Sequence, residues 1–194
     1  MAFRARYRDS LALIILLGGC AGGPQPPDWQ LNAASALQAF ERHYLAGDTQ
    51  AADREFVLAR REIARTGRAD LVARAELRRC AVRVASLEFD DCPGFERLRD
   101  GAGGEELAYA NYLLGKAGTK AGEEPLSRLV AAGVELRKGA ITPAAIAAAV
   151  DIASAQGWRR PLLAWLGVQA KRAQDAGDSE TAARIRRRMD LISG

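Results

Sequence analysis

Few side chains in this sequence could carry chemistry, and the presence of a single histidine limits what they could do. Because His43 is that histidine, a catalytic triad or a multi-histidine metal site would have to be built around one residue. No Gly-x-Ser-x-Gly motif supplies an activated serine. We therefore expect His43 to be an ordinary helical residue, and we expect neither a cofactor nor a metal site.

Paired acids are the other candidates, because a glycosidase works with two carboxylates. They occur at Asp90-Asp91, Glu105-Glu106 and Glu123-Glu124. Adjacent residues on a helix or strand point in different directions, so no pair is a site by itself. A structural role is the alternative for Glu105-Glu106, since negative charge at a helix start is favourable. A peptidoglycan-cleaving hydrolase would have to draw its acid from four residues: Glu41, Glu105, Glu106 and Glu123.

The segment 115–120 has the residue types of a phosphate-binding loop without their order. That loop requires Gly-x4-Gly-Lys-(Ser/Thr) after a β-strand, and the sequence provides neither the spacing nor the strand. The stretch from Gly115 to Glu124 is polar and broken by glycines, so we expect a mobile surface loop.

Two basic runs, Arg159-Arg160 and Arg184 with Arg186-Arg187-Arg188, have two open interpretations. They could attract anionic lipid head groups or an acidic partner. They could equally form a solvated face, because cations near a helix C-terminus are favourable without any ligand.

The first residues have the three-part layout of a secretory signal. Arg4, Arg6 and Arg8 precede the apolar run 11–17, and small residues follow it. A spanning helix needs about 20 apolar residues, so this run is too short for a permanent transmembrane helix. We predict that residues 1–19 are a removable signal peptide.

The end of that segment, Leu17-Gly18-Gly19-Cys20, resembles the lipobox of bacterial lipoproteins. The resemblance implies cleavage before Cys20 and attachment of diacylglycerol and an N-acyl chain, such as palmitate, to that cysteine. Two or three acyl chains give stable anchoring, whereas one is marginal. By the sorting rule of these lipoproteins, Ala21 favours the outer membrane, so we expect a periplasm-facing proteobacterial envelope lipoprotein. The alternatives are an ordinary secretory signal, or a cytosolic protein with an apolar start.

Removal of the signal leaves a chain of one expected domain. Residues 20–28 combine the lipidated cysteine with a Gly/Pro-rich tether, and residues 29–194 form a single all-helical domain. The signal contains three arginines and one aspartate, so 28 basic and 24 acidic residues become 25 and 23, and the formal charge falls from +4 to +2. This balance gives no support for a nucleic-acid partner.

Export would leave Cys80 and Cys92 as an even pair in an oxidising compartment, which favours a disulfide. In one straight helix these residues would be about 18 Å apart, far beyond the ~7 Å limit between Cα atoms of a bridge. The helix that carries Cys80 must therefore end before Cys92, and Asp90-Asp91 and Pro93-Gly94 provide the break. Two buried free thiols are the alternative.

Apolar side chains recur at helical spacing along the mature chain, and β-branched runs of period two are absent. We predict an all-α fold, an array or bundle of about nine short helices in antiparallel hairpins. The helix at 69–87 is apolar on more than one side and should be central. The expected helices cover residues 29–45, 49–63, 69–87, a short segment around Phe95 and Leu98, 107–114, 126–136, 143–155, 161–176 and 179–192.

One short sequence pattern occurs near both ends of the domain. Ala46-Gly47-Asp48-Thr49 and Ala176-Gly177-Asp178-Ser179 each close one helix and start the next. The turn resembles that of tetratricopeptide-type repeats, although the tryptophan, Leu-Gly and terminal proline of that pattern and a ~34-residue period are absent. We expect an array that is TPR-like in shape at most; shared capping chemistry is the alternative.

Nothing after Cys20 forms a catalytic signature, so the sequence favours a non-enzymatic binding or accessory module for another envelope protein. A carrier of lipid or small molecules, with an apolar pocket between helices, is the second possibility. A peptidoglycan-acting hydrolase is the third. Fold class does not decide among them.

Overall fold

A computed structural model of the chain describes residues 25–118 and 122–194. Within these residues the fold is all-α, as predicted, with nine α-helices, one 3-10 turn and no strand. Cys20, the expected signal peptide and most of the expected tether lie outside the described residues. None of the described helices is both long enough and apolar enough to cross a membrane.

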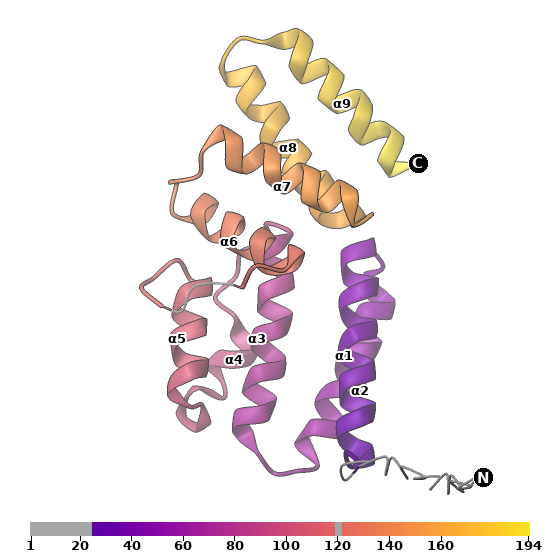
Figure 1. Cartoon of the computed structure of the whole chain (residues 1–194), viewed down its shortest axis with the longest axis vertical. Coiled ribbons are helices and arrows are strands. Elements are labelled where there is room, and N and C mark those ends of the chain that lie inside the picture. Colours follow the sequence, from indigo (N-terminus) through magenta and orange to yellow (C-terminus); the bar gives the residue numbers. More distant parts are fainter. Residues whose placement is uncertain (1–24, 119–121) are drawn as a thin grey trace, which may run out of the picture.

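Helices α1 (Asp28–Ala46) and α2 (Thr49–Ala64) form the first antiparallel hairpin, which stands at one side of the molecule (Figure 1). The two predicted apolar stripes face each other, and every member is buried: Ala33, Leu37, Phe40 and Tyr44 on α1 and Ala52, Phe56, Ala59 and Ile63 on α2. The aromatic rings of Phe40 and Phe56 meet with their centroids 5.1 Å apart, which joins the helices through their largest side chains.

Helix α3 (Ala69–Ala85) is the central helix that the sequence predicted. It belongs to two hydrophobic cores at once: Leu77, Ala81 and Val84 pack towards the C-terminal helices, whereas Val72 and Val82 pack towards the first hairpin. Its contacts extend to α1, α2, α4, α5 and α6. Every other part of the fold up to α6 is therefore arranged around this helix.

The segment after α3 contains short elements that close against it. The expected helix around Phe95 and Leu98 is divided into α4 (Pro93–Glu96) and the 3-10 turn η1 (Arg99–Gly101), and α5 (Gly104–Leu113) follows. Next, α6 (Pro125–Arg137) crosses α3 at close range. At the crossing, Gly133 leaves no room for a side chain, since a Cβ there would lie 2.4 Å from the carbonyl oxygen of Val84.

Helices α7 (Pro143–Ala155), α8 (Arg159–Asp175) and α9 (Ser179–Ser193) complete the array at the end of the molecule opposite the start of α1 (Figure 1). Thr142 caps α7, because its Oγ1 accepts the N–H of Ala145 at 3.2 Å. Helix α8 begins two residues before the predicted start. Pro161 is then the third residue of the helix, where a missing N–H costs no helical hydrogen bond.

The similar sequences near the two ends of the domain form turns of the same geometry. Gly47 and Gly177 adopt φ values of +96° and +76°, and the following aspartates cap the next helix. Asp48 Oδ1 accepts the N–H of Ala51 at 3.0 Å, and Asp178 Oδ1 accepts that of Thr181 at 2.9 Å. Glycine is the residue that adopts this backbone conformation without strain.

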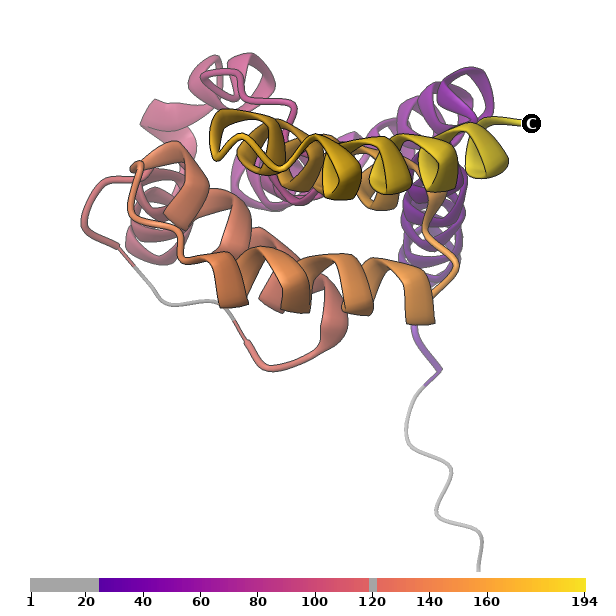
Figure 2. The same ribbon diagram turned by 90° about the horizontal axis from the view of Figure 1, so that it is seen from above.

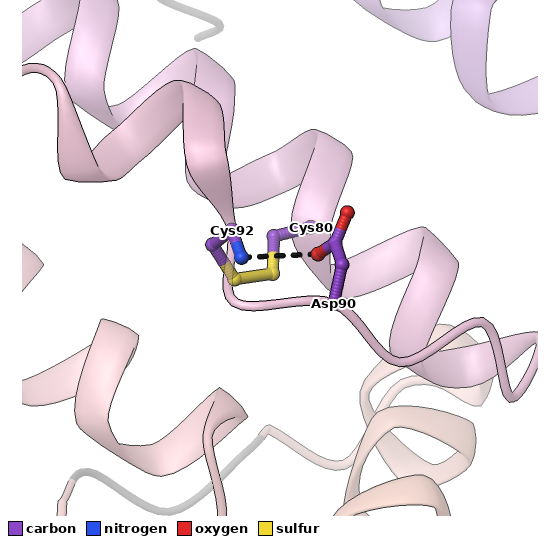
Figure 3. Close-up of side chains that lie close together, drawn as sticks. All are labelled: Cys80, Asp90 and Cys92. Atoms are coloured by element: carbon purple, nitrogen blue, oxygen red, sulfur yellow. Dashed lines mark hydrogen bonds between the residues drawn. A yellow bond between two sulfur atoms is a disulfide. The ribbon is translucent and has the colours of Figure 1, made fainter.

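The predicted disulfide joins Cys80, on α3, to Cys92, just before α4, with 5.5 Å between the Cα atoms (Figure 3). The loop between them also contains Asp90, whose Oδ1 accepts the N–H of Cys92 at 3.0 Å. Cys92 has a φ of +49°, which is uncommon outside glycine, so these two ties hold a strained turn. The two sulfurs and the Asp90 carboxylate cluster like metal ligands, but the sulfurs are bonded to each other.

Arg160, at the start of α8, ties the C-terminal helices to the first hairpin. Its Nε donates to the carbonyl oxygen of Tyr44 at 2.8 Å, and its Nη2 donates to Thr49 Oγ1 at 2.5 Å. Its Nη1 pairs with Glu88 at 2.8 Å, and its guanidinium lies over the Tyr44 ring. Nearby, the indole N–H of the fully buried Trp165 donates to the carbonyl oxygen of Ala85.

The packing predicts opposite effects for two glycine substitutions in helices. Gly133→Ala should lower the free energy of unfolding by about 1–3 kcal/mol, because the added methyl group overlaps the α3 backbone. Gly167→Ala should raise it by about 0.5–1 kcal/mol, because the only atom near its Cβ is the Met189 methyl carbon, 4.0 Å away. Urea denaturation of both variants measures the difference, and a neutral Gly133→Ala would contradict the close crossing.

Candidate functional site

The largest concave feature of the described residues is a groove of about 830 Å³, which we name the central groove. This volume is within the range of ligand-binding pockets. Residues of α1, α3, α5, the start of α6 and the turn before α8 line it: Gln38, Glu41, Arg42, Leu45, Arg74, Leu77, Arg78, Ala81, Glu105, Glu106, Tyr109, Glu124, Pro125, Leu126, Ser127, Val130, Gln156 and Trp158.

The floor of the central groove is apolar. Leu45, Leu77, Ala81 and Val130 contribute to it from α1, α3 and α6, and each is buried. Leu126 is half-buried and packs beside them at the first turn of α6. An apolar side chain placed in the groove would therefore exchange water for hydrocarbon contacts.

The walls are formed by ion pairs between helices. Arg78 on α3 binds both carboxylate oxygens of Glu41 on α1, with 2.8 Å between Nη2 and Oε2. Arg74, one turn earlier on α3, binds Glu106 on α5 and lies 3.7 Å from Glu105. Two arginines at helical spacing thus connect α3 to both neighbouring helices, and they fix the walls of the groove.

Glu106 is a buried acid with two hydrogen-bonding partners. Its side chain is 5% exposed, it receives the Arg74 guanidinium, and its Oε2 accepts the N–H of Gly103 at 2.9 Å at the start of α5. Burial by itself would raise the pKa of Glu106, but the hydrogen bonds from Arg74 and from the backbone outweigh it and hold the pKa below its usual 4.5. Glu106 is therefore ionised at neutral pH.

A second acid in the groove is also held ionised. The Ser127 hydroxyl donates to Glu124, and this bond, together with a backbone N–H, lowers the pKa of the carboxyl group. A general acid requires a raised pKa, because it must still carry its proton near neutral pH. Neither Glu106 nor Glu124 meets that requirement.

Several polar groups of the groove form no hydrogen bond or ion pair within the described part of the chain. Among them are the side chains of Gln38 and Arg42, both exposed on α1, and the hydroxyl of Tyr109 on α5. Burial, together with nearby Tyr112, raises the pKa of Tyr109 to about 12, so its hydroxyl keeps its proton and can donate. These groups are available to a bound molecule.

The structure collects three of the four acids that the hydrolase hypothesis required. Glu41, Glu105 and Glu106 line the central groove, and Glu124 lines it in place of Glu123. Arg74 and Arg78 are the arginine partners of these acids. No local sequence signal pairs them with acids 32 and 37 residues away.

The remaining sequence candidates have structural surroundings. His43 is half-buried on α1 and does not line the central groove. Asp90 caps the N–H of Cys92 and pairs with Arg83, and Asp91 pairs with Arg137 at 3.1 Å. The segment 115–124 is only partly described, since residues 119–121 lie outside the described ranges. Arg160 neither awaits an anionic ligand nor belongs to a solvated face, because its N–H groups bind Tyr44, Thr49 and Glu88.

No protein-family model, curated protein or solved structure matches this chain.

The ties of Glu106 predict a specific pH dependence. Since its pKa is lowered in the folded state, its contribution to stability is complete above the unfolded pKa and is lost as the pH falls through the folded pKa. Glu106→Gln should destabilise the protein by about 1–2 kcal/mol at pH 7, and the deficit should shrink below about pH 4.

Denaturant titrations of the wild type and the variant from neutral to acidic pH measure this effect. Glu105→Gln is the matched control, because Glu105 is 91% exposed and should change stability by less than about 0.5 kcal/mol. A deficit for Glu106→Gln that stays constant with pH would contradict the assignment.

Proposed function

We propose that this chain is a lipoprotein of the bacterial envelope, anchored through Cys20 and facing the periplasm from the outer membrane. In this proposal it is a non-enzymatic module that holds a segment of another envelope protein in the central groove. The observation that carries it is the groove itself, which combines an apolar floor, fixed charged walls and free hydrogen-bonding groups at the rim.

The chemistry of the groove suits a polypeptide segment. Apolar side chains would pack on Leu77 and Val130, while Tyr109 and Gln38 would bind backbone amide groups. Arg42 would pair with an acidic side chain, since it has no carboxylate partner of its own among the described residues. The wall charges are already neutralised in pairs, so they would orient a bound segment without attracting every ion of one sign.

A hydrolase is supported less well by the same geometry. The acids of the groove sit against arginines or hydroxyl groups, and the pKa values of Glu106 and Glu124 are lowered. A glycosidase needs one carboxyl group that stays protonated until it meets the substrate. The groove therefore favours binding over acid catalysis.

The anchor is supported by the lipobox-like end of the signal and by the disulfide. A Cys80–Cys92 bond is the state expected in an oxidising compartment such as the periplasm. The first helix begins at Asp28, so seven residues, 21–27, and thus eight residue steps, would separate the start of α1 from the lipidated cysteine. At about 3.3–3.6 Å per residue, this tether would reach about 25–30 Å from the bilayer.

Affinity capture with a blocked groove tests the proposal. A tag after Gly194 would be used to purify the protein from detergent-solubilised envelopes, and co-purified envelope proteins would be quantified by mass spectrometry. Gln38→Trp adds a large side chain at an exposed groove position, so it should reduce capture of the partner by about tenfold or more. The mass of the purified chain should correspond to residues 20–194 with three acyl chains.

Gln50→Trp is the matched control, because Gln50 is exposed on α2 and does not line the groove. It should capture the partner as the wild type does. Absence of any enriched protein, or equal capture by both variants, would overturn the binding proposal. An unacylated chain would overturn the anchor alone. Release of fragments from peptidoglycan by the purified protein would favour the hydrolase.

A further inference from the structure

A second pocket, of about 530 Å³, lies among the last three helices, far from the central groove. Both α7 and α9 pack against α8, and Figure 2 shows α7 and α9 running in the same general direction. The arginine pocket, as we name it, is defined by Arg172, Arg184 and Arg188 together with Ile146, Leu166 and Ile185. It therefore combines cationic and apolar side chains in one depression.

The three guanidinium groups have no carboxylate partner within the described residues. Arg184 reaches only Thr181 Oγ1, at 3.4 Å, and Arg188 donates to Ser154 Oγ at 3.1 Å. Asp178, which accepts the backbone N–H of Thr181, attracts Arg184 electrostatically but forms no ion pair with it. By contrast, all eight arginines between positions 60 and 83 form ion pairs.

The basic run on α9 is divided by the fold into two groups. Arg184 and Arg188 are one helical turn apart and face the pocket, so their like charges repel each other. Arg186 instead donates to Gln174 on α8, and exposed Arg187 does not line the pocket. A uniformly solvated basic face would not bring three arginines from two helices into one depression.

The floor of the arginine pocket is hydrocarbon. Ile146 and Leu166 are buried in the main core and form its base, and Ile185 on α9 is half-buried beside them. A simple anion would leave the apolar lining residues that are open to solvent, Pro143 and the exposed part of Ile185, in contact with water. A molecule with both an anionic group and an apolar part would cover the arginines and the floor together.

We propose that the arginine pocket binds the phosphate group of a phosphate ester that carries an apolar chain, which is the chemistry of an anionic phospholipid. Guanidinium groups bind phosphate oxygens through paired N–H donors, and three arginines line this pocket, none of them in an ion pair within the described residues. The site is separate from the central groove, so its failure in a test would leave the groove proposal standing.

Calorimetric titration tests this proposal on the mature chain, residues 20–194, with Cys20→Ala to prevent lipidation; this chain retains every described helix. The probe is dihexanoyl phosphatidylglycerol below its micelle concentration, and inorganic phosphate is titrated separately. The lipid should bind at least about tenfold more tightly than phosphate, since only the lipid covers the floor. Added salt should weaken binding, because the attraction is electrostatic.

Two triple variants with the same net charge separate a built site from diffuse positive charge. Substitution of Arg172, Arg184 and Arg188 by Gln should weaken lipid binding at least about tenfold. Substitution of Arg159, Arg186 and Arg187 by Gln removes three arginines of the same helices outside the pocket, and should leave binding within about twofold. Circular dichroism checks that both variants remain helical.

Three results would overturn the proposal: no lipid binding at millimolar concentration, equal weakening by both triple variants, or phosphate binding as tight as lipid binding. If the pocket variant fails to fold, methyl NMR of the wild-type chain decides. Lipid should then shift the signals of Ile146, Leu166 and Ile185. Shifts confined to residues outside the pocket would contradict the site.

Discussion

The burial of α3 on several sides is the constraint on which the rest of the structure depends. One helix supplies Leu77 and Val84 to one core and Val82 to another, so neighbours must pack against it from different directions. Its arginines lie at the boundaries between these neighbours, where their stems are covered and their charged groups reach acids on other helices. The helices packed around α3 diverge from one another. The ion pairs of Arg78 with Glu41 and of Arg74 with Glu106 bridge them to α3 and form the walls of the central groove.

A second set of contacts gives the groove its far side. The turn before α8 supplies Gln156 and Trp158 to the lining, and it stays in place because Arg160 binds the end of α1 and the start of α2. The indole of Trp165 adds a buried hydrogen bond to the end of α3. The shape of the groove thus depends on contacts between parts of the chain more than 70 residues apart.

Local features of this fold were predictable because they depend on neighbouring residues. The stripes of α1 and α2, the Thr142 cap, and the paired glycine and aspartate turns at Gly47 and Gly177 follow from helical periodicity and capping chemistry. The disulfide followed from an even pair of cysteines with a helix break between them. The groove was not predictable, because its walls depend on how helices distant in sequence align. Arg160 illustrates this: a basic residue suggested a surface role, and only the docking of α8 shows what it binds.

The central groove and the arginine pocket differ in the charges that line them. The walls of the central groove are formed by ion pairs and suit a protein segment, whereas the arginines of the arginine pocket form no ion pairs within the described residues and suit an anionic amphiphile. The central claim is that the groove is where another envelope protein binds. Photo-crosslinking in intact cells tests it most directly, with a photoreactive amino acid placed in turn at Gln38, Gln156 and Gln50. We predict the same crosslinked envelope protein from Gln38 and Gln156, which both line the groove, and none from Gln50. Equal crosslinking from Gln50, or no adduct from either groove position, would contradict the account.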